Sequence, residues 1–280
     1  MNRGWILITG CSTGIGRALV GQLRARGYAV VATARKVETL SDLPPGGDLR
    51  ALSLDVTDAA SIAAAVEACR DLRFVGLVNN AGYGQIAPME LLTPEELRAQ
   101  FETNVVGLHA MTRAFLPLIR AKAAKGEGRI VHIASVLGRV PIPLAGAYNA
   151  SKHAVVALAE SLRLEIGDEI PVLLVEPGAI RTEFRRTLTS VWGDLPARAE
   201  GTRYARILRA YLEKKDSLGE RWALAPERCA ARIAAAIAKR RPPRRLVIGK
   251  DAFWALKAKA ILPAWLWERA LRRTYGLRQA

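Results

Sequence analysis

Short apolar runs alternate with amphipathic stretches over most of the chain, and this alternation strongly limits the folds open to it. The apolar runs predict strands at 5–10, 29–35, 49–56, 74–82, 128–135, 170–178 and 244–249. Helical spacing predicts helices at 16–27, 58–70, 93–122, 148–166 and 226–240. The third helix begins with a capping pattern, Thr93, Pro94 and Glu96. We therefore expect an α/β fold with a Rossmann-type, doubly wound parallel sheet.

The predicted organisation is a single domain over residues 1–250, followed by a substrate-binding C-terminal extension over 251–280. A chain of 280 residues suits one α/β unit of this kind. Within the domain, residues 181–225 break the alternation, and a long segment of this type favours a lid or substrate-binding element. Its aromatic residues are Phe184, Trp192, Tyr204, Tyr211 and Trp222. They could wall an apolar pocket, and the alternative is that they close a small core.

The positive charge is concentrated at the C-terminus. The chain carries a formal net charge of +16, and from Lys239 onward twelve basic residues face two acidic ones. We interpret this as a solvated basic face, and since only charge supports nucleic-acid binding, no nucleic-acid partner is expected. The extension also contains Trp254, Trp265 and Trp267, and Pro263 should break its helix. We favour a flap over the pocket or against a partner subunit, and a peripheral membrane contact is the alternative.

The three cysteines, Cys11, Cys69 and Cys229, are widely separated. Their spacing suits neither a disulfide framework nor a zinc site, so we expect no metal and a reducing, cytoplasmic location. An apolar run begins almost at Met1, which disfavours a signal peptide, and we find no apolar stretch long enough for a membrane span. A membrane-peripheral location is the alternative.

A glycine-rich turn, TGCSTGIG at residues 9–16, joins the first predicted strand to the first helix. Gly10 permits the tight turn. Gly14 and Gly16 allow a phosphate-bearing ligand to approach the backbone closely and the helix to pack closely on the strand. The start of the helix then offers free N–H groups to a pyrophosphate. This arrangement predicts a dinucleotide site. The other residues assigned to it here are Ser12, Thr13 and Ile15.

The end of the second strand should select the cofactor. An acidic residue there binds a free ribose, whereas a basic one suits a 2′-phosphate. The sequence has Ala34 followed by Arg35 and Lys36, so we predict that NADP(H) is preferred and keep NAD(H) as the alternative. Arg35 would contact the phosphate with help from Ser12, and the competing interpretation is a solvated loop, which is stronger for Lys36.

The stretch YNASK places Tyr148 and Lys152 four residues apart on a predicted helix, so they share a face. An ammonium group beside a phenol stabilises the phenolate and should lower the tyrosine pKa from about 10 toward the neutral range. The pair is therefore a candidate acid–base device, and the alternative is a routine surface contact.

TGCSTGIG, NNAG (79–82), NVVG (104–107), Ser135 and YNASK occur in an order and spacing that resemble the short-chain dehydrogenase/reductase family. The resemblance runs from about Trp5 to residues 177–182 and more loosely to about Gly249. CSTGIG, ATARK, NNAGYG and VEPGAIRTEF are similar to the branch of hydroxysteroid and retinol dehydrogenases. One departure is Ala134, where the family often has a serine before the catalytic one.

The resemblance implies roles for individual residues. Tyr148 would be the general acid/base, Lys152 would lower its pKa and bind the nicotinamide ribose, and Ser135 would bind the substrate oxygen. Asn104 would anchor a water in a proton relay. Asp55 and Val56 would contact the adenine, and Pro177, Gly178, Ile180 and Thr182 the nicotinamide carboxamide. Asn79, Ala81 and Gly82 would line the cofactor and steady the central sheet.

Together these features predict an NADP(H)-preferring oxidoreductase that interconverts a hydrophobic carbonyl compound and its alcohol by hydride transfer. The resemblance also implies a homodimer or homotetramer. The alternative function is a catalytically silent NADP(H)-binding regulator or scaffold of the same fold. We disfavour it because the tyrosine, lysine and serine are all present.

Overall fold

The computed structural model describes residues 3–214 and 220–277 and contains a seven-stranded parallel sheet. The strands are β1 (Trp5–Ile8), β2 (Ala29–Ala34), β3 (Leu49–Ser53), β4 (Phe74–Asn79), β5 (Arg129–Ile133), β6 (Val172–Pro177) and β7 (Arg245–Ile248). Their order is β3-β2-β1-β4-β5-β6-β7, which confirms the doubly wound class. The order reverses between β1 and β4, and ligands of such sheets bind at the carboxyl ends of the strands beside this point.

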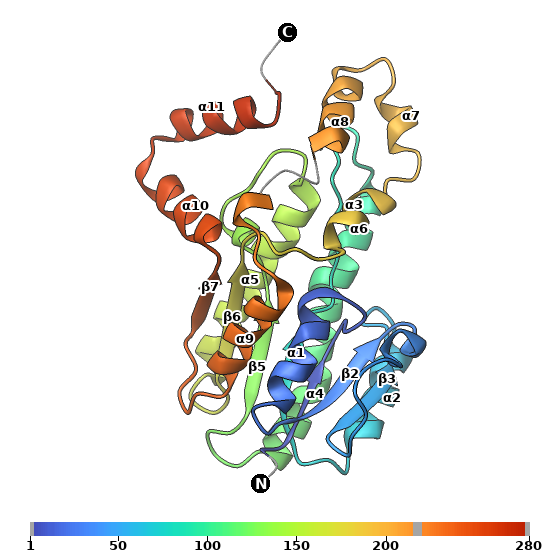
Figure 1. Ribbon diagram of the computed structural model, residues 1–280, viewed down its shortest axis with the longest axis vertical. Helices are drawn as coiled ribbons and strands as arrows, with labels where there is room; N and C mark the ends of the chain where they lie inside the picture. Colours follow the sequence, from blue (N-terminus) through green and yellow to red (C-terminus); the bar gives the residue numbers. More distant parts are fainter. Residues whose placement is uncertain (1–2, 215–219, 278–280) are drawn as a thin grey trace.

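Helices cover both faces of the sheet (Figure 1). They are α1 (Gly14–Arg24) and α9 (Pro226–Ile237) on one face, and α2 (Ala59–Cys69), α4 (Gly107–Lys122) and α5 (Gly146–Ile166) on the other. Successive strand residues serve opposite faces: Ile6 and Ile8 pack with α1 and α9, and Leu7 packs with α2 and α4. Burial on both faces explains the nearly continuous apolar strand sequences.

The predicted helix over 93–122 is divided in the structure. It begins with the expected capping box at Thr93, continues as α3 (Pro94–Phe101), and changes to a π-helical turn at Glu102–Val106 before α4. Prediction of one regular helix was therefore wrong. A π turn inserts one residue into the helix, and such turns often occur at functional sites. Apolar spacing cannot reveal it, because the turn is held by contacts of Asn104 with distant segments.

Residues 181–225 form helices over the carboxyl ends of the strands. These are α6 (Phe184–Ser190), α7 (Leu195–Ala199), α8 (Arg203–Lys214) and a 3-10 turn at Glu220–Trp222, while residues 215–219 lie outside the described residues. Trp192, Tyr204 and Tyr211 belong to a small core, so for them the small-core alternative holds. Trp222 is 46% exposed, which leaves Phe184 as the aromatic of this set that faces the predicted site.

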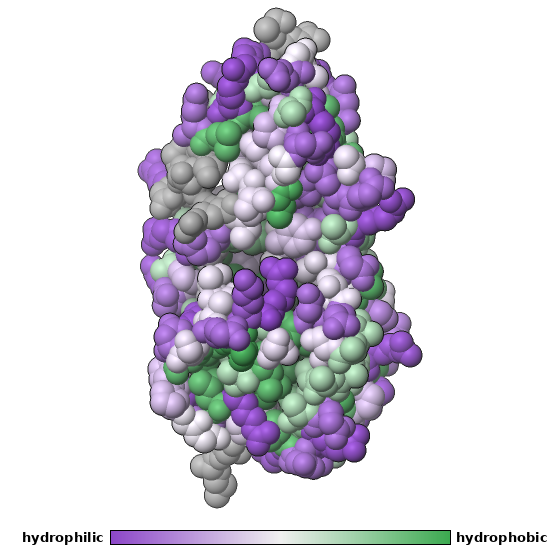
Figure 2. Space-filling model, turned by 90° about the vertical axis from the view of Figure 1, so that its right-hand side faces the viewer, coloured by the Kyte–Doolittle hydropathy of each residue, from purple (hydrophilic) through white to green (hydrophobic). Residues whose placement is uncertain are grey.

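The C-terminal extension folds as α10 (Lys250–Ile261) and α11 (Ala264–Thr274), with the break at Pro263 that the sequence predicts. We call these two helices and the residues up to Leu277 the C-terminal arm. Figure 1 shows the arm extending from the end of β7, along one side of the molecule. Figure 2 shows the face turned by 90° from that view, where apolar residues gather in the lower half. Among the described residues, no helix combines the length and apolarity needed to cross a bilayer.

Candidate active site

The glycine turn lies at the carboxyl end of β1, beside the first residues of the loop that follows β4. Gly10 and Gly14 have positive φ angles, +71° and +63°, which other residues adopt only with strain. A Cβ on Gly10 would lie 2.9 Å from the Cα of Ala81, and one on Gly16 would lie 2.3 Å from the Gly10 carbonyl oxygen. Close packing therefore requires glycine at these positions.

The start of α1 is free to receive a phosphate. Its N-cap residue, Thr13, makes no side-chain hydrogen bond to the helix, and no acidic residue lies in the first turn. The N–H groups there are thus available to an anion, which fits the pyrophosphate of a dinucleotide. Ser12 and Thr13 are exposed beside this turn, whereas Ile15 packs against the main core and supports the turn from below.

Asn80 holds the glycine turn in place, although the sequence analysis gave it no role. Its Nδ2 donates to the carbonyl oxygens of Thr9 and Gly10, each at 2.9 Å. Its neighbour Asn79 points into the core instead, where Nδ2 donates to Thr112 Oγ1 at 2.9 Å. Asn79 therefore steadies the sheet, as expected, and its contact with the cofactor stays a prediction.

The end of β2 presents basic side chains, as the cofactor prediction requires. Arg35 and Lys36 are exposed there, and Ser53 Oγ donates to the Arg35 carbonyl at 3.0 Å. Asp55 follows on the adjacent β3, and its Oδ1 accepts from the N–H and the hydroxyl of Thr57 at 2.9 and 2.7 Å. These bonds, with the charge of Arg35, lower the pKa of Asp55. Val56 is buried beside it.

The three expected catalytic side chains converge in the interior. Ser135 directly follows β5 and starts a 3-10 turn, Val136–Gly138, and its Oγ accepts from the Leu137 N–H at 3.1 Å. Tyr148 and Lys152 lie on one face of α5, with the Lys152 Nζ 5.7 Å from the centre of the tyrosine ring. Exposure is 7% for Ser135, 8% for Tyr148 and 5% for Lys152.

Burial decides the charge states of this group. It raises the pKa of Tyr148 to about 12, while the hydrogen bond with Ser135 acts in the opposite direction. It lowers the pKa of Lys152 to about 8. The net pKa of Tyr148 is therefore raised, not lowered as expected, because desolvation of the phenolate dominates. The Lys152 ammonium donates to the Ile133 carbonyl at 2.9 Å. Tyr148 is a neutral phenol near pH 7.

Asn104 lies in the π turn and braces it against two other segments. Both amide hydrogens are used, since Nδ2 donates to the Tyr83 carbonyl at 2.9 Å and to Ser151 Oγ at 3.0 Å. Ser151, which sequence reasoning missed, donates to the Tyr148 carbonyl at 2.9 Å. A Cβ on Gly82 would lie 2.9 Å from Asn104 Oδ1. The side-chain amide thus links the π turn to the helix that carries Tyr148.

The loop after β6 completes the cofactor side. The methyl group of Thr182 would lie 3.2 Å from a Cβ on Gly14, so this loop meets the glycine turn, and Pro177 and Ile180 lie at its start. The space beside Gly178 is occupied by the carboxylate of Asp251 in α10. One of its oxygens would lie 2.2 Å from a Cβ on Gly178.

Asp251 is a second residue that the sequence analysis missed. Its Oδ2 accepts from the Ala179 N–H at 2.6 Å, and its Oδ1 is buried without a hydrogen-bond partner. A Cβ on Gly249 would lie 2.3 Å from Oδ1. Gly249 is the nearby glycine that leaves room for the carboxylate, whereas Gly178 meets it only through the fold.

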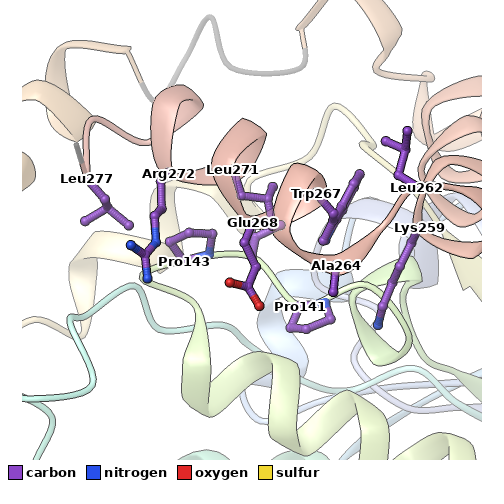
Figure 3. Close-up of a pocket in the computed structure, with 11 residues that line it drawn as sticks. Pro141, Pro143, Lys259, Leu262, Ala264, Trp267, Glu268, Leu271, Arg272 and Leu277 are labelled. Carbon is purple, nitrogen blue, oxygen red and sulfur yellow. The ribbon is translucent and has the colours of Figure 1, made fainter.

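Phe184 and the C-terminal arm bound the catalytic segment. The ring of Phe184 lies 5.4 Å from that of Tyr148, centre to centre. From the other side, Trp267 packs against the small cluster of Val136, Val140 and Ala252, and Lys259 donates to the Arg139 carbonyl. Between the arm and the loop that joins Ser135 to Tyr148 lies a cavity of about 640 Å³ (Figure 3). Its apolar lining includes Pro141, Ile142, Pro143, Leu262, Trp267 and Leu271.

A family model described as short chain dehydrogenase matches residues 4–191. The chain is 36% identical to a 3-ketodihydrosphingosine reductase of Bacteroides thetaiotaomicron, over 98% of each protein. It is 32% identical to an NADPH-dependent 3-dehydrocapnine reductase of Ornithobacterium rhinotracheale, over 92% of this chain and 93% of that protein. Human retinol dehydrogenase 16 is 36% identical over 67% of this chain and 62% of its own length, which supports the retinol dehydrogenase-like branch.

Solved structures of the same fold contain nicotinamide cofactors. A short chain dehydrogenase of Burkholderia cenocepacia in complex with NADP has a TM-score of 0.72 and 26% identity, covering 98% of this chain and 99% of its own. A 3-ketoacyl-(acyl-carrier-protein) reductase of Brucella melitensis complexed with NADH has a TM-score of 0.71 and 27% identity, covering 88% and 97%. Both cofactors thus occur among proteins similar to this chain.

Proposed function

We propose, from the premise that the chain belongs to the short chain dehydrogenase family and is an oxidoreductase, that it interconverts a hydrophobic carbonyl compound and its alcohol with NADP(H). The observation that carries this proposal is the joint burial of Ser135, Tyr148 and Lys152, with Lys152 Nζ 3.8 Å from where a Cβ on Gly82 would lie. The names of the reductases and dehydrogenases to which the chain is similar support the reaction class.

In the reducing direction, a proton must reach the carbonyl oxygen as the carbon gains a hydride, which a bound nicotinamide supplies. Ser135 donates a hydrogen bond to the carbonyl oxygen and stabilises the developing negative charge. Tyr148 is protonated near pH 7 because burial raises its pKa to about 12, so it transfers its phenolic proton to that oxygen and becomes a phenolate.

Lys152 then stabilises the phenolate. Its ammonium is buried on the same helix face, and a charge in a dry site acts strongly on its neighbours. In the oxidising direction the phenolate is the base and removes the alcohol proton. Asn104 and Ser151 act as positioning residues, because they link the π turn to the backbone of Tyr148.

We assign the cofactor site to the loops at the carboxyl ends of the strands, with the adenine half beside β2 and β3 and the nicotinamide half beside β4 and β6. The N–H groups at the start of α1 would hold the pyrophosphate, Arg35 a 2′-phosphate, and Asp55 with Val56 the adenine. Ala81 and Gly82, together with the loop from Pro177 to Thr182, would border the nicotinamide half. The absence of an acid at Ala34 and the exposed Arg35 support NADP(H) over NAD(H).

The substrate class follows from the apolar surroundings. Phe184 of the 181–225 segment faces Tyr148, and the arm adds apolar side chains beside the catalytic loop. We propose that residues 1–250 form the catalytic domain and that the 181–225 segment and the extension shape the substrate site. We propose that the protein is located in the cytoplasm and assembles as a homodimer or homotetramer. We further propose that it contacts a membrane peripherally through the arm.

Cofactor titration followed by a turnover assay tests the proposal. The full-length protein is titrated with NADPH and NADH, monitored by tryptophan fluorescence, and oxidation of the reduced cofactor is then followed with apolar ketones and aldehydes. Tyr148→Phe should retain cofactor binding and lose turnover about 100-fold or more, as expected for a general acid. Arg35→Asp should weaken NADPH binding about tenfold or more and leave NADH binding largely intact.

Arg113→Asp, on the exposed side of α4, is the matched charge control and should change neither affinity. Equal losses in both aspartate variants would contradict a specific phosphate contact at Arg35. Binding without turnover on any substrate would favour the regulator or scaffold. If neither cofactor binds, the proposal fails.

A further inference from the structure

We infer that the outer face of the C-terminal arm docks onto an anionic lipid bilayer. This inference deepens the partner proposal above by naming the surface and its chemistry. Twelve large apolar side chains are exposed in the part of the chain that the structure describes. Six of them lie in a short run of the arm: Phe253, Trp254, Ile261, Leu262, Trp265 and Leu266. A concentration of this kind marks an interaction surface.

The arm has an inner and an outer face with different roles. On the inner face, Ala252 is fully buried, Leu256 and Trp267 pack on the catalytic turn, and Asp251 bonds to the Ala179 N–H. These contacts anchor α10 to the body. α11 has no fully buried residue, and at the arm's bend Trp265 is 64% exposed. Leu262 also lines the cavity beneath the arm, whereas the other five exposed apolar groups belong to none of the hydrophobic clusters among the described residues.

The charge on the arm matches an anionic partner. Six basic and two acidic residues lie between Lys250 and Leu277, and one of the acids, Asp251, is already bonded to the body. Lys257, Arg269 and Arg273 are exposed among the apolar residues. Tryptophan beside lysine and arginine is typical of helices that lie in a membrane interface, with the rings at the headgroup level.

A second copy of this chain is the less suitable occupant. In a two-fold interface built from this face, each basic arm would meet its own copy, and like charges would be opposed. An anionic bilayer offers the opposite charge and an apolar interior for the exposed side chains. Docking would also bring lipid next to the cavity of about 640 Å³ beneath the arm, whose floor is the loop between Ser135 and Tyr148. In Figure 3, Trp267 and Leu271 lie over Pro141 and Pro143 of that floor.

Vesicle co-sedimentation of the full chain tests this inference without depending on turnover. Vesicles of phosphatidylcholine alone are compared with vesicles that also contain phosphatidylglycerol, at low and high salt. We expect binding to the anionic vesicles, weakened by salt, with a blue shift of tryptophan fluorescence. Trp254→Gln/Trp265→Gln should abolish the blue shift and most of the binding. Lys257→Gln/Arg269→Gln/Arg273→Gln should weaken binding roughly 100-fold, at about fivefold per cation.

Matched variants elsewhere separate the arm from overall charge and apolarity. Arg113→Gln/Lys122→Gln/Lys125→Gln removes the same charge from an exposed part of α4 and the loop after it, and Leu164→Gln/Leu212→Gln removes two exposed apolar groups. Circular dichroism verifies that each variant is folded. Equal weakening in the arm and control variants, or no binding to anionic vesicles, would overturn the inference. A wild-type oligomer that dissociates in Trp254→Gln/Trp265→Gln would assign the face to a second copy instead. Failure of turnover alone would leave vesicle binding intact and would count only against the proposed reaction.

Discussion

The catalytic cluster buries polar side chains, whereas the outer face of the C-terminal arm exposes apolar ones. Both reverse the usual arrangement, in which apolar groups are buried and polar groups face water. In the cluster, Tyr148 and Lys152 are polar groups that are 8% and 5% exposed. On the arm, Trp254 and Trp265 are apolar groups that are 62% and 64% exposed. The two regions are nevertheless adjacent, because the inner face of the arm packs on the turn that follows Ser135.

Each departure costs free energy in the isolated molecule, but in a different form. Burial of Lys152 desolvates an ammonium, and its lowered pKa records that cost. Exposure of the tryptophans leaves apolar area in water that a partner could cover. The cost of burying the polar groups is thus offset inside the protein by hydrogen bonds. The cost of exposing the tryptophans can be offset only by a partner that covers them.

Lys152→Met should have the largest effect. We expect reductase turnover to fall about 100-fold or more, because the phenolate loses its neighbouring charge. The free energy of unfolding near pH 7 should rise by about 1 kcal/mol, because a buried ammonium is replaced by an apolar side chain of similar volume. Steady-state kinetics and thermal denaturation measure the two effects.

Lys122→Met, on the exposed part of α4, is the control and should alter neither quantity. The stability gain should shrink with increasing pH. The folded pKa of Lys152, about 8, lies below its unfolded value of 10.5, so the penalty is full below pH 8 and is relieved above it. A destabilised Lys152→Met variant would mean that burial of this lysine is not a cost.

The pH profile of carbonyl reduction should show the next largest effect. Above about pH 8 Lys152 loses its charge, so kcat/KM for the ketone should fall, by up to about tenfold for each further pH unit. Tyr148 does not limit this range, since its pKa of about 12 keeps the phenol protonated. The measurement is kcat/KM at saturating NADPH across the alkaline range. A profile that remains flat well above pH 8 would exclude Lys152 as the controlling group.

Asp251→Ala tests the contact between the inner face of the arm and the loop after β6. Loss of its carboxylate leaves the Ala179 N–H unpaired and opens space beside Gly178, so we expect NADPH affinity to fall roughly fivefold, equivalent to about 1 kcal/mol. Asp251→Asn retains an acceptor of the same shape and should lose less than half as much. Fluorescence titration gives the affinities, and thermal denaturation monitors folding. Equal loss in both variants would indicate that the hydrogen bond at Ala179 is unimportant.

Trp265→Gln should have the smallest effect on stability. This side chain is 64% exposed, so its replacement should change the free energy of unfolding by less than about 0.5 kcal/mol. Phe115→Ala, in the core between α4 and the sheet, should cost about 3–5 kcal/mol. Urea denaturation of both variants gives the comparison. A large cost at Trp265 would show that the arm is already packed within the protein.

The sequence predicted the features that depend on neighbouring residues. The seven strands, the capping box at Thr93, the helix break at Pro263 and the positions of the three turn glycines all follow from local spacing and backbone chemistry. The alternation of strands and helices then limited the topology, because parallel strands need helical crossovers.

The features it missed depend on contacts between distant segments. Asp251 reaches the loop after β6 from 72 residues away, and Ser151 reaches Asn104 in the π turn across 47 residues. The small core around Trp192 and Tyr204 likewise forms only when residues 181–225 fold over the loops beyond β4 and β5.

The sequence by itself determined the fold class, the glycine turn and the pairing of Tyr148 with Lys152, because helix and strand periods act over a few residues. Only the tertiary structure decided the charge state of that pair and the two-faced character of the arm. Desolvation depends on everything that surrounds a group, and here it raises the pKa of Tyr148 although a cation lies one helical turn away. Exposure of Trp254 and Trp265 is decided in the same way, by which segments pack against α10 and α11 and which do not.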